Sequence, residues 1–567
     1  MRKVNANPDT HRNVSMLAIL TLIVGFVLIL RFGQLMIFKT VNNVDLVKYG
    51  QDNENRSSIT EARRGTIFDK NGQPIAMDTT SYSMYAVLNS SWDDNVIKDP
   101  DQTAKTLSQY VNLTQEEILD ILLTPNVDQV EFGNAGRNLT TEQKKQIDSQ
   151  GLPGVKFESS TIRQYVNDYF ASHLIGYAIP EMHKDFQMEL LSGQIGIESG
   201  FNSILSGERQ YQANLENHLT TDFLAGDDIY LTLDSRLQNF MEDLLNRSFE
   251  RYQPEELSAY LVEVESGKLI TAAQRPTFNL NTREGIEAKW TNMLVEEAFE
   301  PGSTIKILTM ALAYDLNLYQ IGETFMSGAI NVYDQVVRDY NLVGWGEITF
   351  DEGLARSSNV AMVNLVQRMG EDKWIDLLSS LGFGRSTQSG LPNETAGSLQ
   401  FDNPVSKIMS GFGQGLSASP MQLLQAYNTI ANEGKQVKIQ YINGIGSTAY
   451  QTKELGQPIT AEAANHVLQL MVNTVEESYG TAQDFKNNHM NIAAKTGTAQ
   501  IANPDGLGYL TGPYDYYFSV VSFFPAEDPQ YMLYISMKRP QNPQGRTGTQ
   551  LISEIFHPFV ENVMINQ

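Results

Sequence analysis

The sequence predicts an α+β fold in which an antiparallel sheet packs against helices. Leu261–Val264 and Leu269–Ala273 read as two strands joined by a short polar turn, which is the pattern of a hairpin. Three further apolar strands come late in the chain, at Ile492–Ile501, Tyr517–Phe524 and Tyr531–Met537. Helical segments fill the chain between the hairpin and these strands, and this order of elements is typical of an α+β domain.

Size and composition exclude several classes of protein. The chain has 567 residues, enough for two or more domains with substantial cores. Its 41 basic and 66 acidic side chains give a formal net charge of −25, which argues against a general nucleic-acid-binding protein because such proteins carry a basic face. No cysteine is present, so disulfides and thiol catalysis are excluded. The seven histidines are scattered without a metal-ligand spacing, and we expect neither metal catalysis nor a cofactor.

The N-terminal residues predict a membrane anchor. Residues 14–38 are mostly apolar over a length that can cross a bilayer as a helix, and the tail at residues 1–13 carries Arg2, Lys3 and Arg12. Positive charge before such a helix predicts a cytoplasmic tail, with everything after about residue 39 outside the cytoplasm. A cleaved signal peptide is the competing interpretation, but no small-residue cleavage site follows the apolar stretch. We therefore expect an uncleaved, single-pass anchor.

Residues 39–225 read as an elongated module with a structural role. The Asp69–Gly72 turn, flanked by two apolar runs, predicts a hairpin because Asn-Gly tolerates the positive φ that a tight turn needs. Tyr82–Leu88 alternates like a further strand. Thr114–Leu123 and Thr140–Ser149 read as helices with threonine caps and acidic first turns. No nucleophile with a matching general base is evident in this region, so we expect it to serve as a support.

A second domain is expected over residues 226–567, after the breaker residues at 219–228. Ile229–Leu233 reads as its first strand. Ser235–Tyr252 follows as a long helix, because its apolar residues recur on one side.

Ser303 and Lys306 are the candidate centre of this domain. Pro301 and Gly302 form a turn signal directly before helix-forming residues, which places Ser303 at a helix N-terminus, where backbone N–H groups favour negative charge. Lys306, three residues on, shares the same helical face. A hydroxyl beside an amine can act as an activated nucleophile. The alternative is an N-capping serine with a solvated lysine, and Ser-x-x-Lys alone does not decide between the two.

Two further motifs favour a catalytic site. Ser357-Ser358-Asn359 occurs directly before the predicted helix Val360–Met369. Lys495-Thr496-Gly497, followed by Thr498, lies in a strand of small residues. Ser-x-x-Lys, Ser-x-Asn and Lys-Thr-Gly, in this order, are the signature of class A β-lactamases and penicillin-binding proteins. We therefore expect the three segments to form one active site.

Two other segments imitate these motifs. Ser160-Thr161-Ile162-Arg163 copies the first motif with arginine, but a guanidinium stays protonated and cannot act as a base. Arg546-Thr547-Gly548-Thr549 copies the third motif, but a polar loop containing Pro543 precedes it instead of a strand. Neither segment displaces the main candidates.

The chain resembles a class B penicillin-binding protein, and closely the septal 2x type of Gram-positive bacteria. The resemblance covers nearly everything from the anchor to the C-terminus. It implies a transpeptidase domain at residues 226–567, with helices on both sides of the sheet, on a pedestal (dimerisation-type) domain at residues 39–225. That type usually carries two small C-terminal repeat domains, whereas here the sequence stops soon after the late strands. The segments that carry the likeness are Arg64–Gly72, Gln274–Phe278, Glu300–Thr304, Phe412–Gly415 and Lys495–Ala502.

The resemblance implies acyl transfer through a serine. Ser303 would attack the carbonyl between the two terminal D-alanines of a peptidoglycan stem peptide, and a neutral Lys306 would take its proton. That role needs a lysine pKa lowered by burial or by a neighbouring cation such as Lys495. Ser357 would relay a proton to the leaving amine, and Asn359 would hold both Lys306 and the substrate amide.

The third motif is implied to bind the substrate. The backbone N–H groups of Ser303 and Thr498 would form the oxyanion hole. The strand edge at Gly497 would take the stem peptide as an added strand, and Lys495, Thr496 and Thr498 would bind its terminal carboxylate. The acyl group would pass to an amine of a neighbouring stem peptide, which closes a cross-link, whereas a β-lactam would acylate Ser303 and stay.

Other functions remain open from the sequence. A D,D-carboxypeptidase differs only in the acceptor, and a β-lactamase shares the triplet but needs efficient deacylation by water. A membrane-anchored, non-catalytic sensor of β-lactams or of the wall is the alternative from another class, although the complete catalytic set argues against it. The resemblance further implies a role in cell-wall synthesis at division. It implies partners among the division proteins, including a polytopic polymerase of the lipid-linked precursor.

Overall fold

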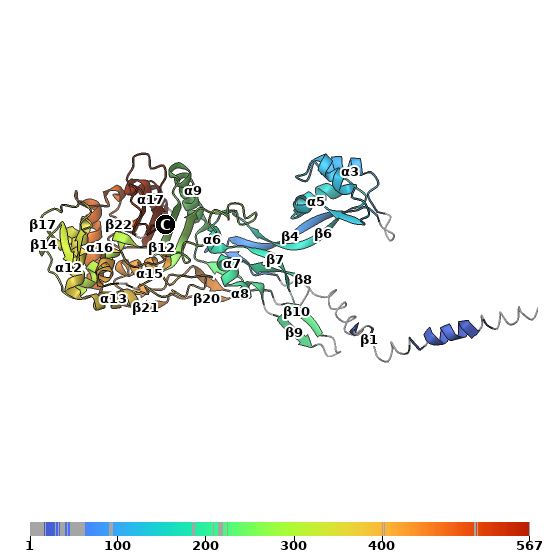
Figure 1. Cartoon of the computed structure of the whole chain (residues 1–567), viewed down its shortest axis with the longest axis horizontal. Helices are drawn as coiled ribbons and strands as arrows, with labels where there is room; N and C mark the ends of the chain where they lie inside the picture. Colours follow the sequence, from blue (N-terminus) through green and yellow to red (C-terminus); the bar gives the residue numbers. More distant parts are fainter. Residues whose placement is uncertain are drawn as a thin grey trace, which may run out of the picture. The chain divides into compact units, whose positions relative to one another are not determined.

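The protein divides into two compact units in its computed structural model, one formed by Met1–Ala62 with Glu208–Leu224 and the other by Arg63–Gly207 with Ala225–Gln567. The second unit holds most of the N-terminal module together with the whole expected catalytic domain, so the boundary at residue 225 stays a prediction. The structure describes isolated stretches before residue 46 and then residues 63–89, 95–183, 188–207, 209–213, 219–223, 225–399, 401, 403–503, 506 and 508–565 (Figure 1).

The first unit contains two antiparallel ribbons, β1–β2 and β9–β10. Their strands are β1 (Thr40–Val41), β2 (Val44–Asp45), β9 (Arg209–Ala213) and β10 (Leu219–Phe223). Within the predicted anchor, residues 19–28 are helical, and parts of the segment 14–38 lie outside the described residues. In the portions of the chain that the structure covers, no helix combines the length and the apolar character that a membrane span requires.

A seven-stranded sheet joins the N-terminal module to the catalytic domain. The strand order is β20-β19-β11-β3-β4-β5, with β6 also paired to β4. β11 runs parallel to β3 and antiparallel to β19, so strands from both parts of the chain share one hydrogen-bonded sheet. The strands are β3 (Ile67–Phe68), β4 (Pro74–Val87), β5 (Gln129–Glu131), β6 (Val155–Tyr165), β11 (Ile229–Leu231), β19 (Ile442–Ile445) and β20 (Thr448–Ala449).

The predicted hairpin at Asp69–Gly72 is confirmed, because β3 and β4 are antiparallel neighbours and Gly72 has a φ of 77°. The strand predicted at Tyr82–Leu88 is confirmed as far as Val87, but it is not a further strand, because it is the second half of β4. β4 continues unbroken as a 14-residue strand and pairs with β6 from Ala76 to Ala86. No glycine or proline lies between Ile75 and Tyr82, and the β-branched Thr79 and Thr80 favour an extended backbone there.

The helices predicted beside this sheet are confirmed, together with their caps. Thr114 and Thr140 each form a capping box, in which the threonine side chain accepts a backbone N–H and the side chain three residues on accepts the N–H of the threonine. Ile118 and Ile147 pack on Met84 of β4 in one small core. The elements are α3 (Pro100–Leu107), α4 (Gln115–Leu122), η1 (Gly133–Gly136) and α5 (Thr141–Asp148).

Buried charges hold the base of the module together. Arg64 Nη2 and Arg163 Nε each lie 2.7 Å from the carboxylate of Glu198, and Arg163 Nη1 lies 2.9 Å from Asp78 Oδ1. All four side chains are at most 7% exposed, so the cluster is a fully paired set of buried ions. The short elements around it are α6 (Ser172–Ile175), β7 (Ala178–His183), β8 (Met188–Gly193), α7 (Gly196–Gly200) and α8 (Asn202–Ser206).

The catalytic domain is built on a five-stranded antiparallel sheet, as predicted. Its order is β13-β12-β24-β23-β22, so the early hairpin meets the late strands and β22 is the last strand on one side. The strands are β12 (Glu256–Glu263), β13 (Lys268–Arg275), β22 (Ala493–Gln500), β23 (Tyr516–Phe524) and β24 (Tyr531–Lys538).

Helices cover both faces of this sheet, as the resemblance implied. Along β12, Ala259 and Leu261 belong to one core with α9 and α17, whereas Tyr260 and Val262 belong to a second core with α10, α15 and α16. α17 was not predicted from the sequence. The helices are α9 (Ser235–Tyr252), α10 (Lys306–Asp315), α15 (Pro420–Ala431), α16 (Ala461–Glu476) and α17 (Gly548–Ile565).

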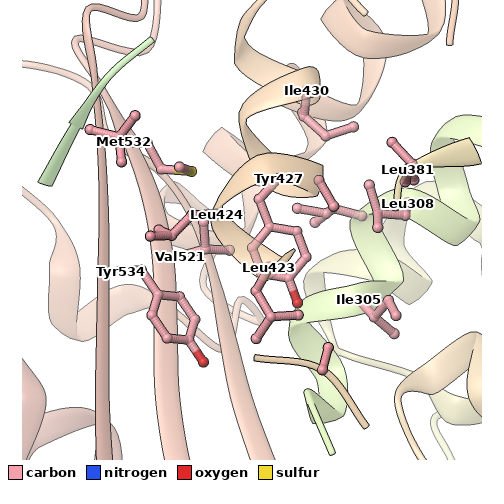
Figure 2. Close-up of a cluster of buried hydrophobic side chains, with 14 of the residues drawn as sticks. Ile305, Leu308, Leu381, Leu423, Leu424, Tyr427, Ile430, Val521, Met532 and Tyr534 are labelled. Carbon is pink, nitrogen blue, oxygen red and sulfur yellow. The ribbon is translucent and has the colours of Figure 1, made fainter. Parts of the chain in front are cut away.

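The second core fixes the position of α10. Figure 2 shows α15 between the sheet and α10, with Tyr427 on α15 and Tyr534 on β24 among the buried side chains. Tyr427 OH lies 2.7 Å from the hydroxyl of Thr304, just before α10. The side chains of this core labelled in Figure 2 are Ile305, Leu308, Leu381, Leu423, Leu424, Tyr427, Ile430, Val521, Met532 and Tyr534.

Shorter elements complete the catalytic domain, and the predicted helix Val360–Met369 is confirmed as part of α12. These elements are β14 (Thr324–Met326), β15 (Ala329–Val332), β16 (Gln335–Arg338), β17 (Glu347–Thr349), β18 (Gln436–Val437), β21 (Glu454–Gly456), α11 (Phe350–Ala355), α12 (Asn359–Met369), α13 (Glu371–Ser380), α14 (Pro404–Met409), η2 (Gly302–Ile305), η3 (Ser410–Phe412) and η4 (Gln483–Phe485).

Candidate active site

Ser303 lies in the 3₁₀ turn η2, and α10 begins directly behind it at Lys306. The structure thus places Ser303 at a helix N-terminus, with one tight turn before the α-helix. Ser303 is half-buried, whereas Lys306 is 0% exposed. The N-cap of η2 is Pro301, so the alternative of a capping serine beside a solvated lysine is wrong.

Two glycines allow neighbouring segments to close on the turn that carries Ser303. Gly302 has a φ of 58°, and a Cβ at this position would lie 3.1 Å from atoms of Ala499 in β22. A Cβ on Gly413 would lie 2.0 Å from the carbonyl oxygen of Gly302. The backbone N–H of Gly302 donates to the carbonyl of Gly413 at 3.1 Å. The turn is therefore held between β22 and the chain at Gly413.

Lys306 is surrounded by neutral acceptors. Its Nζ donates to the carbonyl of Ser357 and to Oδ1 of Asn359, both at 2.7 Å, and lies 3.3 Å from Ser357 Oγ. Burial, and next the nearby Lys495, hold the pKa of Lys306 well below its usual range, while Asp339 opposes this shift. The surroundings therefore favour the uncharged amine.

The joint between α11 and α12 positions Ser357 and Asn359. Ser357 has a φ of 58°, a left-handed conformation that is costly for serine and clusters at functional sites. The Ser358 hydroxyl caps α12 by accepting the N–H of Ala361 at 3.0 Å, and it donates to Asp339 Oδ1 at 2.8 Å. Asp339 is fully buried. Sequence reasoning missed Asp339, because no motif marks a residue whose partners meet only in the fold.

Lys495 approaches the same cluster from β22. Its Nζ donates to Ser357 Oγ and to the carbonyl of Thr496, both at 3.0 Å. Burial lowers the pKa of Lys495 to about 7. The Ser357 hydroxyl therefore lies between two buried amines, 3.3 Å from Lys306 Nζ and 3.0 Å from Lys495 Nζ.

The remaining residues of the third motif lie along β22. A Cβ on Gly497 would lie 2.3 Å from Ser519 Oγ and 3.0 Å from Thr304 Cγ2. Glycine is thus needed because protein atoms, including the turn at Ser303, approach this strand closely. Thr496 is buried and Thr498 is exposed. β22 is the last strand of its sheet, so its outer edge pairs with no other strand of that sheet.

Glu300 connects two loops beside this strand. Its Oε1 accepts the N–H of Gly415 at 2.8 Å and the hydroxyl of Tyr509 at 3.0 Å, and burial raises its pKa. Gln414 Nε2 donates to Oε1 of Gln500, at the end of β22, at 2.7 Å. Glu300 lies in one of the segments that carry the family resemblance, but nothing in the sequence indicated this bridging role.

The structure brings Lys306, Ser357, Asn359 and Lys495 into one hydrogen-bonded cluster, and Ser303 lies on the turn from which Lys306 extends. The two imitating segments lie elsewhere. Ser160–Arg163 belongs to β6, and Gly548 begins the helix α17.

Two families match the chain. The family described as "Penicillin binding protein transpeptidase domain" matches residues 257–561, and the one described as "Penicillin-binding Protein dimerisation domain" matches residues 59–220. The chain therefore belongs to the penicillin-binding proteins that carry a transpeptidase domain. Because a dimerisation domain precedes that domain, the chain is of class B, and the domain that it carries at residues 257–561 is a penicillin-binding transpeptidase domain.

Relatives and solved structures agree with this assignment. Stage V sporulation protein D of Bacillus subtilis (strain 168) is 26% identical, with 92% of this chain and 80% of the relative covered. Peptidoglycan D,D-transpeptidase FtsI of Escherichia coli (strain K12) is 26% identical, with 88% and 82% covered. Penicillin binding protein 2X from Streptococcus thermophilus has a TM-score of 0.76 at 29% identity, with 89% and 80% covered. Penicillin binding protein 3 from Mycobacterium tuberculosis, at 21% identity and a TM-score of 0.66, covering 89% and 96%, shows the same fold.

Proposed function

We propose that this protein cross-links peptidoglycan stem peptides through a Ser303 acyl-enzyme during septal wall synthesis. One observation carries the proposal, namely that Lys306 and Lys495 are buried beside the turn of Ser303 with hydroxyl, carbonyl and amide partners. Among the described residues, neither amine forms an ion pair with a carboxylate. An amine held in this way loses its proton readily and can then act as a general base.

In the acylation step, Ser303 Oγ attacks the carbonyl between the two terminal D-alanines, and its proton passes to Lys306 Nζ. The backbone N–H groups of Ser303 and Thr498 stabilise the oxyanion that forms. The proton then moves through the Ser357 hydroxyl, which lies between the two amines, to the nitrogen of the leaving D-alanine. The C–N bond breaks, and the remaining stem peptide is esterified to Ser303.

The outer edge of β22 supports a binding mode for the stem peptide. An extended peptide can add to such an edge as a further strand, with backbone hydrogen bonds setting its register. Lys495, Thr496 and Thr498 then bind the terminal carboxylate, and Asn359 holds both Lys306 and the substrate amide. An amine of a neighbouring stem peptide attacks the ester, closes the cross-link and frees Ser303.

β-Lactams are proposed inhibitors of the same serine. The solved penicillin binding protein 3 from Mycobacterium tuberculosis is complexed with aztreonam, and the common fold supports the same chemistry here. The opened ring leaves an ester on Ser303 that no stem-peptide amine removes.

Location and partners form the remaining part of the proposal. The septal role rests on the resemblance to the septal 2x type and on the likeness to FtsI. We assign residues 14–38 as a single-pass anchor, with the N-terminus cytoplasmic and the catalytic domain outside the cell, from the pattern of charge and apolar residues. A polytopic polymerase of the lipid-linked precursor and other division proteins are the partners that this location implies.

Intact mass spectrometry after exposure to benzylpenicillin tests the proposal. The native chain should gain one covalent adduct, Ser303→Ala should gain none, and Ser160→Ala in the imitating segment should behave as the native chain. An adduct on Ser303→Ala would refute the assignment of the nucleophile. Rapid loss of the adduct would indicate a β-lactamase. A stable adduct without transfer of a D-Ala-D-Ala-type thioester to an amine would indicate a sensor, and transfer to water alone a carboxypeptidase.

A further inference from the structure

A cavity away from the Ser303 site lies where the catalytic domain meets the N-terminal module. Its volume is about 350 Å³, within the range of pockets that bind small molecules. Residues 438–442 and 449–453 form most of its lining, and Phe201 contributes from the N-terminal module. None of the residues that line it belongs to the proposed catalytic cluster.

Two lysines of this cavity lie side by side. The backbone N–H of Lys438 donates to the carbonyl of Lys453 at 2.8 Å, which places the two residues on adjacent chain segments. Lys438 Nζ donates to the carbonyl of Gln388 at 2.6 Å. In the part of the chain that the structure describes, neither ammonium forms an ion pair with a carboxylate. The lining of the cavity includes both lysines and no carboxylate. Burial, and next the Lys453 ammonium, lower the pKa of Lys438, while Glu394 opposes this shift.

The carboxylate that acts on Lys438, that of Glu394, already accepts hydrogen bonds from other donors. Glu394 influences the charge of Lys438, but its oxygens accept the N–H and hydroxyl groups of both Thr387 and Ser389. Four donors on one carboxylate leave it little capacity for a distant ammonium. The lysines therefore remain available to an anion from outside.

Gln440 lines the same cavity and carries a side-chain donor without a partner just beneath its surface. Its backbone N–H and C=O are both bonded, to Gly267 and Leu269. Its side-chain Nε2 is buried without any partner. A buried amide that lacks a partner costs free energy, and such exceptions in a native structure call for an explanation. An acceptor on a bound ligand would satisfy this group.

Aromatic rings supply an apolar wall. Tyr441 donates its hydroxyl to the carbonyl of Ser389 at 2.7 Å and meets Phe201 edge-on at 6.4 Å between ring centroids, so its ring is fixed. Tyr450 is 42% exposed and offers a free surface for stacking. From these contacts we propose that the cavity binds a small ligand that carries a carboxylate or phosphate on an apolar ring. The oxyanion meets Lys438, Lys453 and Gln440, and the ring packs on the tyrosines.

Binding here would act on the junction of the two parts of the chain. Ile442 begins β19, which pairs with β11, and β11 pairs with β3 of the N-terminal module. A ligand that contacts both Phe201 and Ile442 therefore stabilises the folded form of that junction. We expect its presence to raise the midpoint of thermal unfolding.

The test uses the full chain with Ser303 first acylated by benzylpenicillin, so that the catalytic site is closed. Phenyl phosphate and benzoate are the anionic probes, and benzyl alcohol is the neutral probe of similar size. Calorimetry should show both anions binding at least about tenfold more tightly than benzyl alcohol, because each charge-assisted hydrogen bond is worth roughly a factor of ten or more. The ratio of the two anion affinities separates a phosphate ligand from a carboxylate one. Equal binding of benzyl alcohol would overturn the proposal.

Variants locate the binding. The double change Lys438→Gln with Lys453→Gln should weaken phenyl phosphate about tenfold or more. The matched change Lys435→Gln, at an exposed lysine three residues before Lys438 that does not line the cavity, should not. Gln440→Glu, which keeps the side-chain shape and adds negative charge, should also weaken the anions. Unchanged acylation by benzylpenicillin shows that each variant is folded. In the native chain, the pKa of Lys438, followed by NMR of ¹³C-methylated lysines, should rise when phenyl phosphate binds. Native affinity in both charge variants would refute the site.

Discussion

Two segments of this protein share the residues Ser-Thr-Ile and differ in the cation that follows. In β6, Arg163 is buried and meets carboxylates, Glu198 at 2.7 Å and Asp78 at 2.9 Å. At the start of α10, Lys306 is equally buried but meets a carbonyl, a hydroxyl and an amide oxygen. One cation is neutralised by acids, and the other is left among neutral groups.

The difference follows from the chemistry of the two side chains. A guanidinium keeps its charge at any accessible pH, so burying one requires anions around it, and the result is a structural clamp. An amine can release its proton when it is buried, and burial together with Lys495 pushes the pKa of Lys306 down. Burial without a carboxylate therefore favours the uncharged amine that the proposed base requires, while burial with carboxylates makes the arginine a link between strands and helices.

The largest effect on the acylation rate should come from replacing Lys306 by arginine, the residue that ends the Ser160–Arg163 segment. Lys306→Arg keeps a cation at this position but removes the base, so the second-order rate of Ser303 acylation by benzylpenicillin should fall about 10²–10⁴-fold. Stopped-flow fluorescence or quenched mass spectrometry measures this rate. Lys306→Met, which removes the charge and keeps much of the volume, serves as the control for folding and should lose activity equally. A native rate in either variant would show that Lys306 is not the base.

Removing Arg163 from its buried ion pairs should lower the free energy of unfolding and leave the acylation rate unchanged. Arg163→Met leaves the buried carboxylates of Glu198 and Asp78 without one of their cations, and we expect a loss of about 3–5 kcal/mol in the free energy of unfolding. Urea unfolding measures the loss, and acylation of the folded fraction should keep its native rate.

The matched control for that change is Arg247→Met on α9. Arg247 pairs with Asp243 at 2.9 Å, but both side chains are more than 60% exposed, so removing this pair should change stability little. Equal losses of unfolding free energy in Arg163→Met and Arg247→Met would mean that burial does not make the Arg163 ion pairs more important than an exposed pair.

The pH dependence of acylation tests which buried lysine is neutral and which is charged in the active enzyme. As the pH falls, Lys306 takes up a proton and the base is lost. As the pH rises through about 7, Lys495 in the free enzyme loses the charge that attracts the carboxylate of a substrate or β-lactam. The profile of kcat/KM should therefore be bell-shaped, and Lys495→Arg should move the alkaline limb upward because arginine stays charged. If the alkaline limb stays in place in Lys495→Arg, a group other than Lys495 causes the loss of activity at high pH.

Local patterns in the sequence predicted much of the fold. The two hairpins, the three late strands and the threonine-capped helices each depend on residues close together in the chain. The strand at Tyr82–Leu88 was predicted, but its start was placed too late, because alternation shows that a strand exists and not where it begins. For the site, the three motifs located the cluster. Asp339 and the bridging role of Glu300 were not predicted, because their partners, Ser358 and Tyr509, meet them only in the tertiary structure.

The smallest effect is expected at the serine of the imitating segment. Ser160 is exposed on β6, and no amine activates it in the way proposed for Ser303. Ser160→Ala should leave the acylation rate unchanged and alter the free energy of unfolding by no more than about 0.5 kcal/mol. Calorimetric unfolding and adduct mass spectrometry together check both expectations. A loss of acylation would mean that the shared letters Ser-Thr-Ile carry chemistry without a buried amine, which would remove the distinction on which the catalytic assignment depends.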